Sequence, residues 1–132
     1  MHPRLRITSA WILAGLYASG IFVLSSLSQP PSVPSWELPH FDKLCHTLEY
    51  GGLTFVLMRA LRLTYATRSS ASLALWAIVL AIVYGTLDEF HQAFTPDRTL
   101  SVFDLLADAT GASLVASTWV WVQRRWPTLG KL

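Results

Sequence analysis

Acidic residues are concentrated in one segment of the chain, from Asp88 to Gly111, which contains five of the eight aspartates and glutamates. A second segment, residues 42–50, adds a lysine, a histidine and two further carboxylates. Carboxylic acids and imidazoles that share a low-dielectric cavity suit general acid–base chemistry. The candidate catalytic residues are therefore His46, Asp88, Glu89, Asp104 and Asp108.

The same two segments supply candidates for binding a polar substrate. Lys43 and Arg98 are suited to hold a phosphate or pyrophosphate, the arginine through a two-pronged contact. His46 would act as the base, with Asp104 or Asp108 orienting its ring. The candidate substrate-binding residues are Asp42, Lys43, Glu49, Tyr50, Gln92, Arg98 and Ser101.

The composition places these residues in an integral membrane protein with a single domain, residues 1–132. Apolar residues make up 52% of the chain and charged residues 14%, whereas typical soluble domains contain about 25% charged residues. The mean hydropathy is +0.41. Four long apolar runs predict an all-α bundle of four transmembrane helices, at about residues 8–27, 42–63, 71–92 and 100–123.

The first apolar run follows two arginines, as in a secretory signal peptide. Residues 7–27 exceed the apolar length of roughly 7–15 residues that is typical of such peptides, so we expect a membrane helix that is retained. Residues 28–39 then contain four prolines, which exclude a regular helix. Trp36 in this segment suits a position at the membrane interface.

Basic residues flank the predicted bundle on one side. Eight of the ten lysines and arginines lie near the two termini or around the connector between the second and third helices, and only Lys43 and Arg98 lie on the other side. The positive-inside rule therefore predicts that both termini are cytoplasmic. All eight acids lie towards the outer side. We expect a multi-pass protein of the cell (inner, cytoplasmic) membrane.

Helical spacing groups the polar residues on three helix faces. A carboxylate that faces lipid well inside the membrane costs about 2–3 kcal/mol. We therefore predict that the three faces enclose a polar cavity open to the outer side. A plainer alternative makes Asp42 and Ser101 helix N-caps and Lys43 a residue that reaches to the interface. The faces comprise Asp42, His46, Glu49 and Tyr50; Asp88, His91 and Gln92, with Glu89 at the edge; and Ser101, Asp104, Asp108 and Gly111.

Two spaced patterns cover both polar segments. The first, D-K-x-x-H-x-x-x-Y, consists of Asp42, Lys43, His46 and Tyr50. The second runs through Asp88, Glu89, Gln92, Phe94, Pro96, Arg98, Ser101, Asp104 and Gly111. Both resemble the patterns of VanZ-like membrane proteins, although Asp108 stands where that family usually has asparagine, which adds an acid to the predicted cavity. The resemblance implies an association with the bacterial cell envelope and, from the founding member, low-level teicoplanin resistance; it specifies no reaction.

Several functions are compatible with these residues. One is an enzyme acting on a lipid-linked or phospholipid headgroup at the outer leaflet. Others are a non-catalytic protein that binds or shields such a lipid, and a small transporter or proton relay. His46, His91, Asp88, Glu89 and Asp104 offer metal ligands, but their spacing matches no dedicated metal motif, so we predict neither a metal nor another cofactor.

The expected partner is a membrane lipid or a lipid-linked envelope precursor, and no nucleic acid is expected. Four helices are few for alternating access by a single copy. A homo-oligomer is therefore a further expectation.

Overall fold

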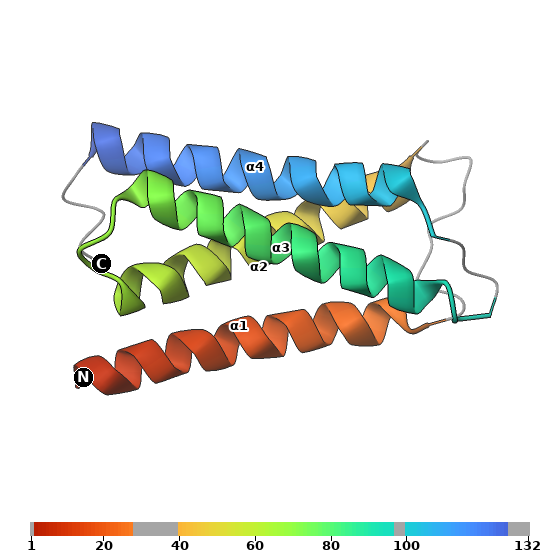
Figure 1. Cartoon of the computed structure of the whole chain (residues 1–132), viewed down its shortest axis with the longest axis horizontal. Helices are drawn as coiled ribbons and strands as arrows, with labels where there is room; N and C mark the ends of the chain where they lie inside the picture. The colour runs from red at the N-terminus through yellow and green to blue at the C-terminus, as the bar shows by residue number, and fades with distance from the viewer. Residues whose placement is uncertain (1, 28–39, 97–99, 127–132) are drawn as a thin grey trace.

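The chain forms an up-down-up-down bundle of four helices in a computed structural model, which describes residues 2–27, 40–96 and 100–126. The helices are α1 (Pro3–Ser25), α2 (Phe41–Thr64), α3 (Ser70–Gln92) and α4 (Val102–Arg125), and the described residues contain no strand. Helices that follow one another in the sequence run in opposite directions, so α2 and α4 run in the same direction (Figure 1). The prediction of an all-α fold is confirmed. The proline-rich segment 28–39, with Trp36, lies outside the described residues.

The helix ends differ from the predicted ones for local reasons. α1 begins at Pro3, several residues earlier than predicted, because proline is well suited to the first position of a helix. α4 begins after Ser101, whose Oγ accepts a hydrogen bond from the backbone N–H of Asp104 at 3.3 Å, so the N-cap interpretation of Ser101 is confirmed. The same interpretation of Asp42 is wrong: the N-cap of α2 is His40, in the left-handed region with φ 60°.

α2 is the central helix of the bundle. It contacts all three other helices, whereas α1 and α4 do not contact each other through the described residues. Nine residues of α2 are buried, more than on any other helix. α1, α3 and α4 are long and apolar enough to cross a membrane, and α2 does not meet that criterion. Three apolar helices indicate a membrane protein, and they surround the one helix that is less apolar.

Small residues bring the helices close together, as is common between membrane helices. Ala77 and Ala81 of α3 are fully buried, as are Ala112 and Ala116 of α4. The closest approach is at Gly111 of α4. A Cβ atom there would lie 2.0 Å from the carbonyl oxygen of Thr47 on α2. The backbones of α2 and α4 therefore touch at this crossing.

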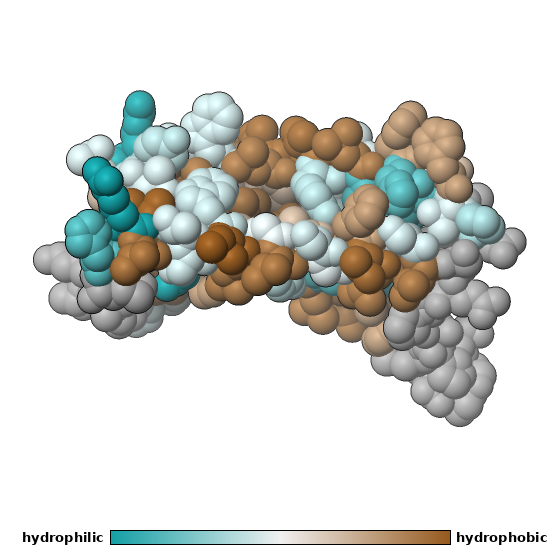
Figure 2. All heavy atoms as spheres, turned by 90° about the horizontal axis from the view of Figure 1, so that it is seen from below, coloured by the Kyte–Doolittle hydropathy of each residue, from teal (hydrophilic) through white to brown (hydrophobic). Residues whose placement is uncertain are grey.

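Charged residues separate to the two ends of the bundle. The start of α1, the α2–α3 connector and the ends of α2 and α4 lie at one end (Figure 1), which carries Arg4, Arg6, Arg62, Arg68, Arg124 and Arg125. We call this the basic end. In Figure 2, hydrophilic residues gather at this end and apolar residues cover much of the middle of the face. The start of α2, the end of α3 and the start of α4 form the opposite, polar end.

Replacing Gly111 with alanine should destabilise the bundle, because the added Cβ would meet the backbone of α2, which cannot rotate away. We expect Gly111→Ala to lower the free energy of unfolding by about 1–3 kcal/mol, the usual cost of overpacking. Denaturant-induced unfolding in detergent micelles measures this change. Gly20→Ala is the control, because nothing lies within 4 Å of the position its Cβ would take. Equal stability of the two variants would contradict the close crossing.

Candidate functional site

The polar end of the bundle contains a group of side chains from three helices that contact one another. We call it the polar cluster: Asp42, Lys43, His46, Glu89, Ser101, Asp104 and Asp108. α2 contributes its first two turns, α3 its last turn and α4 its first two turns with the preceding cap. These segments meet because α2 and α4 run in the same direction and α3 ends beside the start of α4 (Figure 1).

His46 and Asp108 form the innermost pair of the cluster. His46 Nδ1 lies 2.9 Å from Asp108 Oδ1, and Asp108 is only 2% exposed. An ionised carboxylate only accepts hydrogen bonds, so when Asp108 is ionised, Nδ1 of a neutral His46 ring carries the proton and donates it. The other ring nitrogen, Nε2, is then an acceptor. It lies 3.8 Å from Asp104 Oδ2.

Lys43 joins the cluster to the surface. Its ammonium group donates to Asp42 Oδ2 at 2.7 Å and also to Asp104 Oδ1. The Asp42 side chain is 63% exposed, whereas the Asp104 side chain is 13% exposed. Lys43 therefore holds one oxygen of Asp104 and leaves the other facing His46.

Glu89 links the end of α3 to the start of α4. Its Oε2 accepts a hydrogen bond from the backbone N–H of Ser101 at 2.9 Å. Glu89 is 1% exposed, and its Oε1 has no hydrogen-bond partner among the described residues. A buried polar atom without a partner is costly and calls for an explanation. Glu89 thus has one oxygen in a structural role and one available to a ligand.

Tyr50 forms the floor beneath His46. The two rings lie nearly parallel, with centroids 6.4 Å apart, and Tyr50 is fully buried. Gly85 on α3 makes room for this arrangement. A Cβ atom on Gly85 would lie 2.8 Å from Asp108 Oδ2 and 3.0 Å from the Tyr50 ring. Sequence reasoning missed Gly85, although a glycine one turn before Asp88 in an apolar helix is a signal of close packing.

Asp88 is directed towards α1 rather than into the polar cluster, and it is bonded to Gln92 on its own helix. Asp88 Oδ1 accepts a hydrogen bond from Ser25 Oγ at 2.6 Å, and its Oδ2 accepts one from Gln92 Nε2 at 3.1 Å. Beside them, Ser26 Oγ lies 3.2 Å from His91 Nε2. The structure therefore divides the predicted cavity residues of α3 between two sites. Ser25 was missed from sequence, although the topology places it at the same end as Asp88.

Two further candidates lie outside the polar cluster. Glu49 is half-buried on the α1 side of α2, one turn before Gly52, which packs against the hydroxyl of Tyr17. Arg98 lies outside the described residues. Lys43 is therefore the cation that the described residues place in the cluster.

The cluster combines three chemical capabilities. His46 Nε2 is positioned to accept a proton, and Asp108 can stabilise the resulting imidazolium. Carboxylate oxygens can accept hydrogen bonds from the hydroxyl or amine groups of a ligand, and Lys43 can donate to a ligand oxygen. One ligand atom each from His46, Glu89 and Asp104 lies within 4.8 Å of the others, so these residues can also hold a metal ion.

Comparison with protein families identifies the relatives of the chain. The model of the VanZ/LLP1 family matches residues 6–123, which include all of α2 and α3 and nearly all of α1 and α4. The chain belongs to the VanZ/LLP1 family. No curated protein and no solved structure matches the chain significantly. Membership suggests a cell-envelope protein related to teicoplanin resistance.

The fold brings the two VanZ-like sequence patterns together. Lys43 and His46 from the first pattern contact Asp104 from the second, and Tyr50 lies beneath them. In this VanZ/LLP1 protein Asp108 is the direct partner of His46 Nδ1. Residues about sixty positions apart in the chain are thus part of one site.

Ser25→Ala should weaken the attachment of α1 without disturbing the polar cluster. The change removes the hydroxyl that donates to the buried Asp88. Hydrogen bonds between membrane helices contribute about 0.6 kcal/mol on average and up to about 1.7, and we expect a loss towards the upper end because Asp88 is buried. Unfolding in detergent measures it. Ser19→Ala is the matched control, since Ser19 is exposed and bonds only within α1. A smaller loss for Ser25→Ala than for Ser19→Ala would contradict this role.

Proposed function

We propose that this protein binds and chemically modifies the headgroup of an envelope lipid, with the polar cluster as its active site. The observation that supports this most directly is the His46–Asp108 pair, in which Nδ1 is engaged and Nε2 faces the carboxylates of two other helices. A buried histidine held by a carboxylate is the usual form of a general base.

The proposed mechanism is proton transfer through His46. Nε2 accepts a proton from a water or hydroxyl group as the oxygen of that group forms a bond to an electrophilic atom of the headgroup. Nε2 then returns the proton to the leaving oxygen or nitrogen as the bond from that atom to the leaving group breaks. Asp108 stabilises the imidazolium between these steps through the Nδ1–H bond of 2.9 Å. General acid–base catalysis of this kind contributes roughly 10²–10⁴-fold to a rate.

The charge of the cluster indicates which headgroups it favours. Four carboxylates surround one ammonium group, and Lys43 is already bonded to two of them. Such a site repels a bare phosphate and attracts hydrogen-bond donors. The preferred ligand is therefore a headgroup that carries sugar hydroxyls or an amine.

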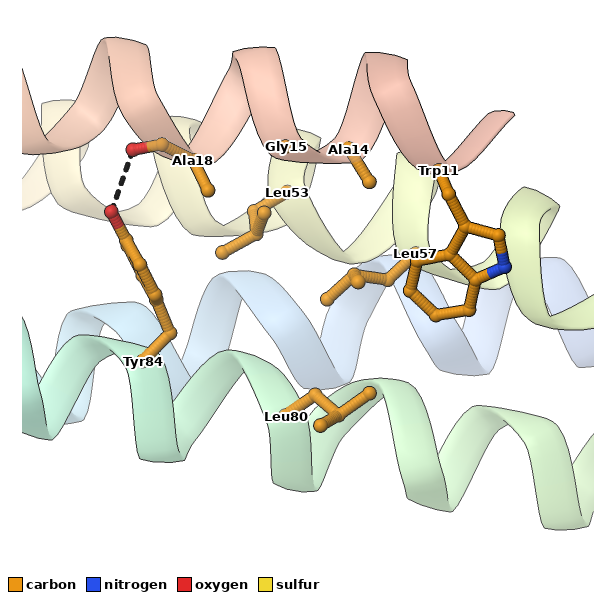
Figure 3. A pocket seen from close by; sticks show the side chains of 8 residues that line it. All are labelled: Trp11, Ala14, Gly15, Ala18, Leu53, Leu57, Leu80 and Tyr84. Carbon is orange, nitrogen blue, oxygen red and sulfur yellow. Dashed lines mark hydrogen bonds between the residues drawn. The ribbon is translucent and has the colours of Figure 1, made fainter. Parts of the chain in front are cut away.

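An apolar crevice on the α1 side of the bundle supports a lipid as the ligand. The crevice has a volume of about 290 Å³ and lies between α1, α2 and α3, with Trp11 near one end and Tyr84 near the other (Figure 3). The Tyr84 hydroxyl donates to the carbonyl of Ala18 at 2.6 Å and bridges α1 and α3 there. Tyr84 is one turn below Asp88. The crevice therefore lies below the Asp88–Ser25 pair, beside the polar cluster, and offers an apolar surface for the chain of an amphiphile whose headgroup binds at the polar end.

We also propose that the polar cluster faces the outer side of the cell membrane, with α2 as a fourth transmembrane helix. The basic end carries the arginines of three helices and of the α2–α3 connector, which favours the cytoplasmic side. α2 can cross because its neighbours cover its polar face.

Cysteine labelling tests this orientation. With Cys45 replaced by serine, we expect a membrane-impermeant maleimide to label Thr95→Cys in intact cells, because Thr95 follows α3 at the polar end. Thr67→Cys, in the connector at the basic end, should react only after the cells are permeabilised. The reverse pattern would overturn the orientation, and labelling of both sites in intact cells would show that α3 does not cross the membrane as proposed.

His46→Gln should abolish headgroup modification. The purified protein is incubated in proteoliposomes of bacterial polar lipids that include lipid-linked wall precursors, and products are followed by mass spectrometry. We expect the rate to fall at least about 100-fold, because glutamine cannot act as the base. His2→Gln is the control, since His2 is exposed at the opposite end. Product formation by His46→Gln at the normal rate would contradict the mechanism.

The same experiment separates catalysis from a second candidate function, binding without turnover. Within the described part of the cluster, Ser101 is the one hydroxyl or thiol group, and its oxygen is engaged as the cap of α4. The cluster thus has no free hydroxyl or thiol nucleophile of its own. Saturable lipid binding by the normal protein, lost in His46→Gln and without any product, would establish the binding function instead.

A further inference from the structure

We propose that His46, Glu89 and Asp104 bind one divalent transition-metal ion, with Zn²⁺ or Mn²⁺ as the fitting ions. One ligand atom from each residue lies within 4.8 Å of the other two. The three residues come from α2, α3 and α4, so the site exists only in the folded bundle. It goes beyond the proposed headgroup chemistry and does not depend on it.

The hydrogen bond of His46 prepares its other nitrogen for a metal. Nδ1 is bonded to Asp108, which is buried, and Nε2 faces Asp104 Oδ2 at 3.8 Å. Histidines that bind metals almost always donate their second ring N–H to a carboxylate or carbonyl, which fixes the tautomer and the orientation of the ring. His46 has this arrangement, with Asp108 as the orienting group.

Glu89 provides independent evidence for a ligand. Its side chain is 1% exposed, and Oε1 has no hydrogen-bond partner among the described residues, whereas Oε2 is held by the backbone of Ser101. The carboxylate is therefore fixed in place with one oxygen unsatisfied. A metal ion shared with His46 and Asp104 would satisfy that oxygen.

Asp104 also has one oxygen engaged and one available. Oδ1 accepts from Lys43, and Oδ2 faces His46 Nε2. Typical distances from zinc to nitrogen and oxygen are about 2.0–2.2 Å, which puts neighbouring ligand atoms roughly 3.3 Å apart in a tetrahedral site. The observed 3.8 Å between these two atoms is close to this separation, so small side-chain movements suffice.

The donor set selects the kind of ion. Imidazole nitrogen suits zinc and other transition metals, and carboxylates also accept manganese, whereas magnesium and calcium prefer oxygen alone. Because Lys43 is the one ammonium group among four carboxylates in the cluster, a dication would also reduce its negative charge. The bound ion would then extend the range of ligands to phosphate-bearing headgroups.

Metal titration of the full-length protein, purified in detergent and stripped with a chelator, tests this site. No lipid is added, so the result is separate from the proposed headgroup chemistry. We expect one Zn²⁺ or Mn²⁺ per chain by calorimetry and elemental analysis, with Mg²⁺ and Ca²⁺ binding at least about 100-fold more weakly. Glu89→Gln and Asp104→Asn should each raise the Kd at least about 100-fold. Asp108→Asn, which alters only the orienting group, should raise it by about 10–100-fold.

Asp88→Asn is the matched control. It removes the same charge from a buried position next to Glu89, but its carboxylate is bonded to Ser25 and Gln92, so the Kd should change less than about threefold. Equal effects of Asp88→Asn and Glu89→Gln would show general attraction of cations and overturn the site.

Electron spin-echo measurements on the normal protein with Mn²⁺ keep the proposal testable if a variant fails to fold. We expect magnetic coupling between the bound Mn²⁺ ion and an imidazole nitrogen of His46. The absence of that coupling, or of stoichiometric binding, would overturn the proposal.

Discussion

The contact on which the rest of the molecule depends is the crossing of α2 and α4 at Gly111. The absent side chain lets the α4 backbone lie against the Thr47 carbonyl. Because the two helices run in the same direction, residues just before the crossing on each helix face one another (Figure 1). His46 and Asp108 occupy those positions, at hydrogen-bond distance. A wider crossing would separate the pair and leave two polar groups unpaired in an apolar bundle, which is costly.

This crossing also explains why the least apolar helix is the central one. α2 carries Lys43 and His46 in its first two turns. It does not meet the criterion of length and hydropathy for a membrane-spanning helix, which the other three helices meet. Contacts with all of them shield it. One oxygen of the buried Asp108 is held by His46 of α2, and one oxygen of the buried Glu89 is held by the backbone N–H that precedes α4. Neighbouring elements thus replace part of the water that these carboxylates lose, while the second oxygen of each has no hydrogen-bond partner among the described residues.

The all-α fold and most of the site could be predicted from the sequence, because apolar runs and helical spacing report the faces of single helices. Lys43, His46, Asp104 and Asp108 were placed together on that basis. What could not be predicted is how each face is turned towards its neighbours. Asp88 and Glu89 are adjacent, so their side chains diverge by about 100° on a helix. Glu89 consequently faces α4, while Asp88 faces Ser25 of α1. Single-helix spacing contains no information on that choice.

Asp108 determines what His46 can do, because it fixes which ring nitrogen is available. With Nδ1 engaged, Nε2 can take up a proton or a metal ion, but not both at once. The two proposed uses of the cluster are therefore alternatives at a single atom. An asparagine in place of Asp108 could orient the ring through its amide oxygen, but it would carry no charge. Orientation of Nε2 is thus the property that both residues provide, and the carboxylate of this chain adds attraction for whichever cation Nε2 binds.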